Sequence, residues 1–300
     1  MNKPELSIII LNYNTSELLN NCLESLNKLK DELDFEVIVV DNGSSDGSVS
    51  MIRRNHRWVR LIESGKNLGF AKGNNLAKNS VRSNYVLFLN SDTVVPRNTL
   101  SASMNYLKEN KLGAIGCKQI LADGSLDKDA RRSFITPWIG LVHLFLKLDV
   151  FFPKSRLFSK YWYGYISENQ THDVDALQGS FIMSPKNILD SVGWYDEDYF
   201  LDGEDIDLCW KIKNLGKRVV YYPKVSIIHL KGATKGKNRK SKKYVSLSEK
   251  IKFRLTGVNS MEIFYRKRLW NKYPLYVNIL VILGIKILKL IRGLQILIFK

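Results

Sequence analysis

The sequence predicts an α/β fold in which a mostly parallel central sheet is flanked by helices. One reason is that short apolar runs alternate with segments whose apolar residues recur at helical spacing, the pattern of strand–helix–strand units. A second reason is that two of these runs end in an aspartate, Asp41 and Asp92, where parallel strands present ligand-binding groups. Gly69 and Gly73 do not form a GxGxxG pattern, which disfavours a dinucleotide-dependent dehydrogenase.

The first four strands are expected near the N-terminus. Residues 6–11 form a continuous apolar run, as a strand buried on both faces requires, and residues 12–15 turn the chain into a helix. Residues 35–40 predict the second strand, residues 59–62 a shorter third and residues 85–89 the fourth. Helical crossovers between consecutive strands make this part of the sheet parallel.

Residues 97–229 predict two helices and four strands. In chain order these are a helix at 97–111, strands at 113–117 and 173–183, a helix that starts near Glu204, and strands at 218–223 and 225–229. Gly179 is expected to permit a close backbone approach within the 173–183 strand. Gly216 ends the second helix as a typical C-cap residue.

Residues 137–152 form a segment dense in Trp, Leu, Phe and Val. Only three polar side chains interrupt it, His143, Lys147 and Asp149. The segment is too short and too charged to span a bilayer. Two interpretations stand equally: packing into the core, and an apolar flap that faces a membrane.

The length and cysteine usage of the chain limit its class. Three hundred residues with 45% hydrophobic content can bury a sizeable core. The three cysteines form no CxxC pair, which disfavours a zinc ribbon or a disulfide framework and suits a reducing compartment. No apolar leader precedes the first predicted strand, so secretion is not expected.

The net charge of +17 is concentrated in the C-terminal quarter. Residues 1–230 hold 28 Lys and Arg against 27 Asp and Glu, whereas residues 231–300 hold 18 against 2, a net charge of +16. We therefore expect a domain over residues 1–232 and a basic C-terminal region over residues 233–300. Such a region implies an anionic partner, either a nucleic acid or a membrane surface.

A basic patch and an aliphatic helix follow each other in the C-terminal region. The patch consists of Lys235, Lys237, Arg239, Lys240, Lys242 and Lys243. Residues 275–299 are mostly Ile, Leu and Val, and their uncharged run at 275–285 is too short to span a bilayer. This segment contains three charged residues, Lys286, Lys289 and Arg292, which gather along one side of a helix. We predict an interfacial amphipathic helix assisted by the patch, with a core-packed helix as the alternative.

Two aspartates are expected at the same edge of the sheet. Asp92 closes the fourth strand, where it can hold a divalent cation that in turn holds a diphosphate; a plain turn is the alternative. Asp41 closes the second strand and can bind a base or ribose; a helix cap is its alternative. Because the carboxyl ends of parallel strands meet at one edge, both acids are expected in one nucleotide-sized crevice.

The helix that starts near Glu204 carries a carboxylate on its inward face. Asp205 shares that face with the apolar residues at i+3, i+4 and i+7. Desolvation there raises a carboxyl pKa and suits a general base, whereas nearby N–H donors lower the pKa; a first-turn acid favoured by the helix dipole is the alternative. His229 closes an apolar run and is either structural or a ligand to a group in this site.

Six stretches in order form a combined signature. They are residues 39–47 (VVDNGSSDG), 67–75 (NLGFAKGNN), 89–92 (LNSD), 179–180 (GS), 204–210 (EDIDLCW) and 229–232 (HLKG). Together they resemble glycosyltransferase family 2, and within it the bacterial rhamnosyltransferase-like branch. The resemblance covers about residues 6–232 and implies a GT-A fold, the fold of nucleotide-diphospho-sugar transferases, with inversion at the anomeric centre.

The resemblance also implies roles for individual residues. Asp205 would be the catalytic base, and Asp92 would hold Mg²⁺ or Mn²⁺ with His229 near the metal or the diphosphate. Asn90 stands where the strict DxD motif has an aspartate, a departure that favours a deoxysugar donor such as dTDP-rhamnose. The residues implied to bind the nucleotide sugar are Asn12, Asp41, Asn67, Gly73, Asn74, Asn90, Ser91, Gly179 and Glu204.

The chemistry fits these residues independently. An inverting transfer needs one carboxylate base and a cationic group that stabilises the leaving diphosphate. A glycosidase would instead need a pair of catalytic carboxylates.

The expected partners follow from the basic tail. A membrane position suggests a lipid-linked saccharide as the acceptor, at the cytoplasmic face of the bacterial cytoplasmic membrane, in cell-surface polysaccharide synthesis. Alternatives are a family 2 transferase with another donor, such as a UDP-hexose, and a catalytically dead membrane-tethered binding module, which the presence of Asp92 and Asp205 disfavours. Nucleic-acid binding is not expected, because no recognised motif is present and the basic residues lead into aliphatic sequence.

Overall fold

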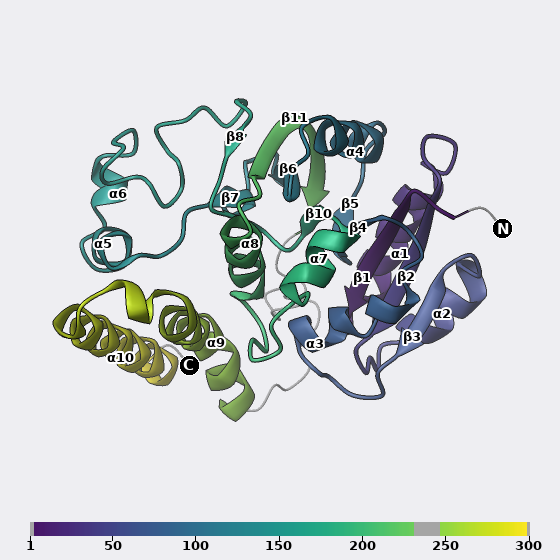
Figure 1. Cartoon of the computed structure of the whole chain (residues 1–300). Coiled ribbons are helices and arrows are strands. Elements are labelled where there is room, and N and C mark those ends of the chain that lie inside the picture. Colours follow the sequence, from purple (N-terminus) through teal and green to yellow (C-terminus); the bar gives the residue numbers. More distant parts are fainter. Residues whose placement is uncertain (1–2, 231–246, 299–300) are drawn as a thin grey trace.

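The computed structural model describes residues 3–230 and 247–298. Within these ranges the chain forms a nine-stranded mixed sheet covered by helices (Figure 1). In spatial order its strands are β3 (Arg60–Glu63), β2 (Phe35–Asp41), β1 (Leu6–Asn12), β4 (Tyr85–Asn90), β10 (Phe181–Pro185), β6 (Ala114–Leu121), β11 (Val219–His229) and β5 (Thr93–Val94), with β8 (His172–Asp173) paired to β11. A separate two-stranded sheet consists of β7 (Arg131–Arg132) and β9 (Ala176–Leu177).

Helices connect the strands and extend beyond the sheet. The α-helices are α1 (Ser16–Asn27), α2 (Ser48–Asn55), α3 (Phe70–Asn75), α4 (Thr99–Glu109), α5 (Pro137–Gly140), α6 (Leu148–Phe151), α7 (Lys186–Val192), α8 (Glu204–Asn214), α9 (Leu247–Phe264) and α10 (Leu275–Ile298). Short 3₁₀ or π segments are η1 (Lys78–Ser80), η2 (Lys128–Ala130), η3 (Leu141–Phe145), η4 (Tyr265–Leu269) and η5 (Trp270–Lys272).

The sheet separates two hydrophobic cores. Successive residues of β1 point to opposite faces, so Ile9 joins one core and Ile8 and Ile10 join the other. The first core is covered by α8 and the end of α9, and the second by α1 and α4. Burial on both faces explains why β1 and β2 read as continuous apolar runs.

The predicted parallel sheet is confirmed for its first four strands, since β1 pairs in parallel with β2 and β4, and β2 with β3. The predicted strand at 173–183 is wrong, because it is divided into β8, β9 and β10. At the second break the backbone N–H of Gly179 donates to Asp205 (3.0 Å) instead of to a neighbouring strand. The two strands predicted at 218–229 form the single strand β11, whose irregularity lies beside Pro223, a residue without an N–H.

Residues 137–152 combine the two interpretations that the sequence left open. They form α5, the π segment η3 and α6. Ile139 and Val142 are buried, whereas Val150 and Phe151 are among the most exposed apolar side chains of the described residues. The segment therefore packs inward on one side and presents apolar surface on the other.

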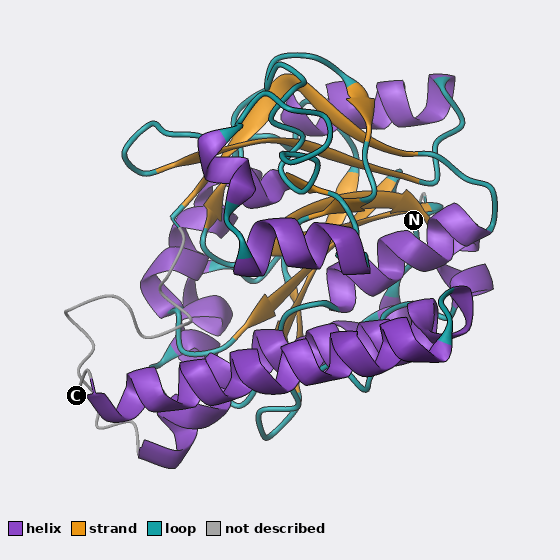
Figure 2. Cartoon of the chain, turned by 90° about the vertical axis from the view of Figure 1, so that its left-hand side faces the viewer, coloured by secondary structure: helices purple, strands orange, loops and turns teal. Residues whose placement is uncertain are grey.

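The helices α9 and α10 pack side by side against the rest of the protein. In Figure 2, α10 is the long helix that ends near the C label. Phe264 and Tyr265 join the same core as Trp194. On the predicted charged side of α10, Lys289 pairs with Glu262 of α9 (2.7 Å), whereas Lys286 is exposed. The basic patch at 235–243 and the predicted boundary at residue 232 both lie outside the described residues, and both stay predictions.

One buried ion pair links the C-terminal helices to α8. Arg268 donates from Nε to Oδ1 of Asp207 (2.7 Å) and from Nη2 to Oδ2 (3.1 Å), and Asp207 is 0% exposed. Arg268→Ala leaves this carboxylate buried without its main counter-ion, and we expect the free energy of unfolding to fall by about 3–5 kcal/mol in urea denaturation.

Lys267→Ala is the matched control for that substitution. Lys267 pairs with Asp198 (2.6 Å), whose side chain is mostly exposed, and with Asp196 (2.7 Å), which keeps Arg268 3.5 Å away as a second cationic partner. Because no carboxylate is left buried without a counter-ion, the loss of Lys267 should cost about 1 kcal/mol. Equal losses for the two variants would show that the buried pair does not anchor the C-terminal helices.

Candidate active site

The carboxyl ends of β1, β2 and β4 bring predicted site residues to one edge of the sheet. Asn12 lies opposite Asp41 in the β1–β2 register, and Leu11 lies opposite Asn90 in the β1–β4 register. The buried Asp41 accepts hydrogen bonds from Asn12 Nδ2 (2.9 Å) and from the backbone N–H of Ser44 (2.9 Å). The predicted meeting of strand ends is therefore present, and the Asp41 carboxylate is fixed within it.

The loop before α3 is held by Asn42, a residue that the sequence analysis did not single out. Its Oδ1 accepts from the N–H of Leu68 (2.9 Å), and its Nδ2 donates to Oδ1 of Asn67 (3.1 Å). Gly69 has a φ of +85°, and a Cβ there would lie 2.5 Å from the carbonyl oxygen of Phe200. This loop thus needs glycine to contact the segment that leads into α8.

Two residues that were predicted to bind the nucleotide sugar, Gly73 and Asn74, make contacts that stabilise and position α3. A Cβ on Gly73 would lie 2.5 Å from Leu11, so the glycine allows α3 to approach β1. Asn74 donates from Nδ2 to the carbonyl of Phe70 within the helix (2.9 Å). Contact of either residue with a nucleotide sugar stays a prediction.

The end of β4 joins a chain of polar contacts. Ser91 Oγ lies 2.9 Å from Thr15 Oγ1. Asp92 Oδ1 lies 3.3 Å from His229 Nε2, and His229 Nδ1 lies 3.1 Å from Oδ2 of Asp127. Burial lowers the pKa of His229, but hydrogen bonds to the two carboxylates outweigh it and raise this pKa to about 9. The imidazole of His229 therefore favours its protonated form, and from its place between the two carboxylates it holds Asp92 in position.

The donors near Asp92 suit a divalent cation that is shared with a substrate. Among the described residues, no three His, Cys, Asp or Glu side chains are arranged as a ready-made metal site. Mg²⁺ is commonly held by one or two carboxylates together with substrate phosphates, so such a cage is not required. Asp92 at a strand end, with the oxygen-bearing side chains of Asn90 and Ser91 beside it, fits this mode of binding.

Asp205 occupies the inward position that the helical pattern predicted. It is 6% exposed, and its Oδ2 accepts from Arg132 Nη2 (2.6 Å) and from the N–H of Gly179 (3.0 Å). Burial disfavours the charged form of Arg132, but the charge of Asp205 outweighs it and raises the pKa of the guanidinium. Arg132 is a partner that the sequence analysis missed, although it lies in a polar segment.

The two parts of the site are connected through residues 179–180. The carbonyl of Ser180 accepts from the N–H of Asn90 (3.2 Å), and the preceding Gly179 donates to Asp205. The end of β4 and the first turn of α8 therefore adjoin the same short segment.

Several buried polar atoms around Asp205 have no hydrogen-bond partner among the described residues. They are Arg132 Nε, Gln178 Oε1, Tyr195 Oη and Glu204 Oε2. Burial, and then the charges of Glu204 and Asp205, raise the pKa of Tyr195. Because buried polar groups in native proteins are nearly always paired, this cluster indicates a place for a polar ligand or water.

The buried Glu204 should make the stability of the folded protein depend on pH. Burial, and then the charges of Asp205 and Asp202, raise its pKa well above 4.5. The folded protein therefore holds a proton that the unfolded chain releases above about pH 4.5, so its contribution to stability is full below that pH and is lost as the pH rises. Glu204→Gln, which cannot ionise, should gain thermal stability relative to wild type between pH 5 and pH 8.

Thermal melting of both proteins across this pH range measures the effect. A difference in Tm that stays constant with pH would contradict a protonated Glu204.

The chain is similar in sequence to several known proteins. The family model described as "Glycosyl transferase family 2" matches residues 7–183. The N-acetylglucosaminyl-diphospho-decaprenol L-rhamnosyltransferase of Mycobacterium tuberculosis is 25% identical over 245 residues, which cover 78% of each chain. Rhamnosyltransferase WbbL of Escherichia coli is 28% identical over 232 residues, 74% of this chain and 82% of its own length.

Solved structures share the fold. The mannosyltransferase PcManGT from Pyrobaculum calidifontis, in complex with GDP-Man and Mn²⁺, has a TM-score of 0.57 at 20% identity; the match covers 89% of this chain and 65% of that one, less than two thirds of its length. GalNAc-T7 with UDP, GalNAc and Mn²⁺ has a TM-score of 0.54 at 12% identity, covering 76% of this chain and 44% of that one. The predicted GT-A fold is confirmed.

Proposed function

Because the chain belongs to glycosyl transferase family 2, we propose that it is an inverting enzyme that moves a deoxyhexose, rhamnose in particular, from a nucleotide-diphosphate donor to a lipid-linked saccharide. The observation that carries this proposal is the buried Asp205 among polar atoms without partners, next to the strand ends. The activity serves the synthesis of a cell-surface polysaccharide.

The reaction is one displacement at the anomeric carbon. Asp205 takes the proton from the acceptor hydroxyl as that oxygen bonds to the anomeric carbon, and the bond to the diphosphate breaks on the opposite face. Arg132 and the N–H of Gly179 hold the Asp205 carboxylate in one orientation. A single carboxylate suffices, since a diphosphate leaves without a catalytic acid.

The donor is proposed to bind along the strand ends. Asp41, fixed by Asn12, contacts the nucleoside, and the other proposed ligands of the donor are Asn67, Gly73, Asn74, Asn90, Ser91, Gly179 and Glu204. Asp92 would hold Mg²⁺ or Mn²⁺, which neutralises charge on the leaving diphosphate when it is bound. His229 orients the Asp92 carboxylate through the 3.3 Å contact.

The names of two relatives support the choice of substrates. Both are rhamnosyltransferases, and the name of the mycobacterial relative specifies a diphospho-decaprenol acceptor. Asn90 in place of a second aspartate is consistent with a deoxysugar donor. We therefore propose dTDP-rhamnose as the donor and a diphospholipid-linked saccharide as the acceptor.

A panel of nucleotide sugars tests the proposal. Transfer to N-acetylglucosaminyl-diphospho-decaprenol is measured with dTDP-rhamnose, UDP-hexoses and GDP-mannose, and dTDP-rhamnose should give the highest kcat/KM. A preference for a UDP-hexose would assign another donor. Binding of a donor without transfer to any acceptor would indicate a binding module.

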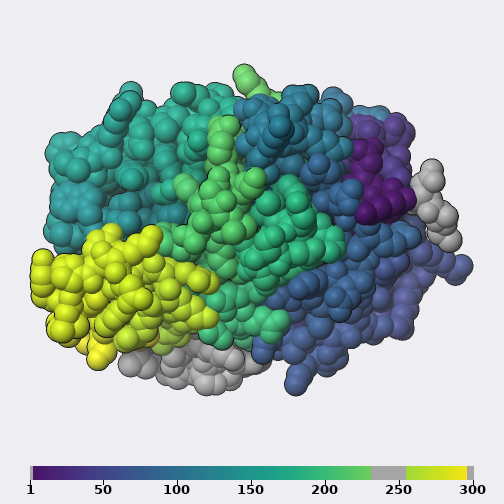
Figure 3. All heavy atoms as spheres, in the orientation of Figure 1, coloured from purple at the N-terminus to yellow at the C-terminus, as the bar shows by residue number. Residues whose placement is uncertain are grey.

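A surface of apolar side chains supports attachment to a membrane. We call it the apolar patch; it consists of Val150, Phe151, Phe152, Leu157, Leu275, Tyr276, Ile279, Leu280, Leu283, Ile287, Leu290, Ile291 and Leu294, all exposed. Figure 3 shows that the C-terminal helices (yellow) lie next to the teal segment that supplies the other members. Exposed patches of this kind mark membrane or protein contacts. In the part of the chain that the structure describes, no helix has the length and hydrophobicity needed to cross a bilayer.

Peripheral attachment at the cytoplasmic face predicts the effect of charges placed in the patch. Ile279 and Leu290 are 50% and 63% exposed, and the double variant Ile279→Glu/Leu290→Glu should lower binding to anionic vesicles at least about tenfold in cosedimentation. Leu215→Glu, at an exposed position directly after α8, should leave binding unchanged. Wild-type binding by the double variant would remove α10 from the membrane contact.

A further inference from the structure

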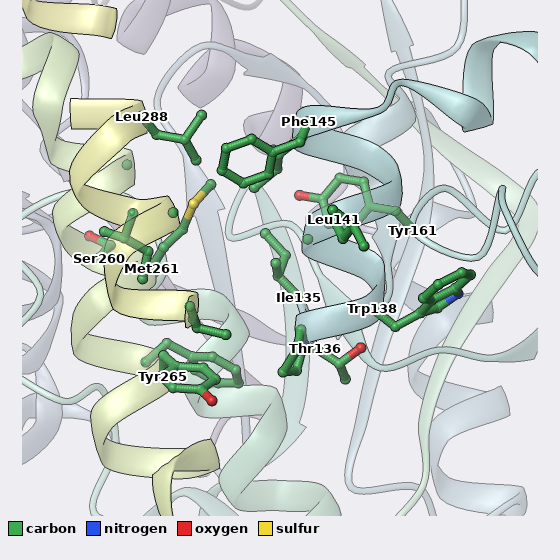
Figure 4. Close-up of a pocket in the computed structure, with 18 of the residues that line it drawn as sticks. Ile135, Thr136, Trp138, Leu141, Phe145, Tyr161, Ser260, Met261, Tyr265 and Leu288 are labelled. Carbon is green, nitrogen blue, oxygen red and sulfur yellow. The ribbon is translucent and has the colours of Figure 1, made fainter. Parts of the chain in front are cut away.

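A cavity of about 970 Å³ lies beside the first turn of α8. It is bounded by α5 and η3 on one side and by α9 and α10 on the other. Figure 4 shows Leu141 and Tyr161 on one side of it and Ser260, Met261 and Tyr265 on the other. Most of its lining is aliphatic or aromatic, and its volume is at the upper end for small-ligand sites.

One end of the cavity adjoins the proposed base. Gly203 and Ile206, which lie on either side of Asp205 in the sequence, both line the cavity. Arg132 also lines it, with Nη2 2.6 Å from Asp205 Oδ2 and a buried Nε without a partner among the described residues. The acidic residues in the lining are Asp129 and Asp202, and Asp205 is reached through its contact with Arg132. This end therefore presents groups that hydrogen-bond to hydroxyls and, through the guanidinium, to phosphate oxygens.

The other end opens onto the apolar patch. Six residues of the lining are also 42–66% exposed: Trp138, Leu141, Phe145, Leu280, Leu283 and Ile287. The last three belong to the apolar patch itself. A hydrocarbon chain can therefore pass from a bilayer into the cavity without crossing water.

We infer that this cavity binds the hydrocarbon chain of the lipid-linked acceptor, with its anionic head at Arg132 and its saccharide hydroxyl at Asp205. The inference rests on the proposed function, because it places the acceptor of that reaction. The observation that supports it is that one continuous apolar cavity joins the apolar patch to the residues around the base. A polar acceptor would need the polar end alone.

Gly257 offers a variant that fills the cavity. It lines the cavity from α9, and a Cβ there would lie 3.7 Å from Arg292 Nη1 and 3.8 Å from Asp202 Oδ2, which are ordinary contact distances. Gly257→Phe therefore places a ring in the channel without a backbone clash. Gly293→Phe is the matched control, since nothing lies within 4 Å of a Cβ at that helical position and the residue does not line the cavity.

The contribution of the hydrocarbon chain to acceptor binding is measured with two acceptors. Both carry the same saccharide diphosphate, one on a decaprenyl chain and the other on an ethyl chain. Each buried methylene is worth about fourfold in affinity, so wild type should have the lower KM for the decaprenyl acceptor. Gly257→Phe should raise that KM at least about tenfold and leave donor affinity unchanged. The control should behave as wild type. An unchanged KM for the decaprenyl acceptor in folded Gly257→Phe would overturn the inference.

Direct labelling separates this inference from the proposed reaction. A decaprenyl phosphate with a photoreactive group in its chain should label the cavity of wild type, for example at Met261 or Phe145, and labelling should fall in Gly257→Phe. If wild type transfers sugar to neither acceptor but is labelled in this way, the proposed reaction fails and the lipid site stands. No labelling of the cavity, or equal competition by phosphatidylglycerol vesicles, would refute an acceptor-specific site.

Discussion

Asp205→Asn is expected to lower the turnover of sugar transfer by roughly 10²–10⁴, the usual contribution of a general base. Asparagine has the same shape and can still accept from Arg132 and Gly179, but it cannot take the acceptor proton. Donor binding, measured by calorimetry, and the circular dichroism spectrum should match those of wild type. The loss should therefore appear in kcat, with the KM for the donor little changed.

Asp207→Asn provides the contrast, two residues further along the same helix. Asp207 contacts Arg268 and Tyr199 and has a structural role. Its substitution should lower Tm while the folded fraction keeps near-normal turnover. If folded Asp205→Asn turned over at the wild-type rate, Asp205 would have no part in the chemistry.

Removal of divalent cations is expected to abolish transfer, and Mg²⁺ or Mn²⁺ should restore it. In Asp92→Ala the restoration should fail, because Asn90 supplies no second charge beside Asp92. Mn²⁺ binding in the presence of a nucleoside diphosphate, followed by electron paramagnetic resonance, should be lost in the same variant.

Asp123→Ala is the control for the metal experiment. Asp123 is exposed, and its carboxylate accepts only from Ser125 in the contacts of the described residues. This variant should keep both Mn²⁺ binding and activity. Full wild-type activity in chelator would instead mean that protein groups alone stabilise the leaving diphosphate.

The strands at the edge of the site could be predicted because strands buried on both faces consist of consecutive apolar residues. β1, β2 and β4 each read as an apolar run that ends in a polar residue, and the register confirms that these ends meet. The inward placement of Asp205 followed from helical periodicity in the same way. These features depend on local spacing, which one sequence contains.

The partners of the key side chains could not be predicted, because they are distant in the chain. Arg132 lies 73 residues from Asp205, and Asp127 lies 102 residues from His229. No periodicity relates positions so far apart. The charged side of α10 shows the same limit. The spacing of its charged residues predicted that Lys289 lies on one side of a helix, but its pairing with Glu262 on α9 depends on tertiary packing.

The measurement that tests this account most directly is the anomeric configuration of the product. Wild-type protein is supplied with dTDP-β-L-rhamnose, Mg²⁺ and the diphospholipid-linked saccharide, and the new linkage is analysed by nuclear magnetic resonance. Single displacement with Asp205 as the base predicts that the linkage has the configuration opposite to that of the donor. A product with the donor's configuration would require a second displacement or a different mechanism, and would contradict the account.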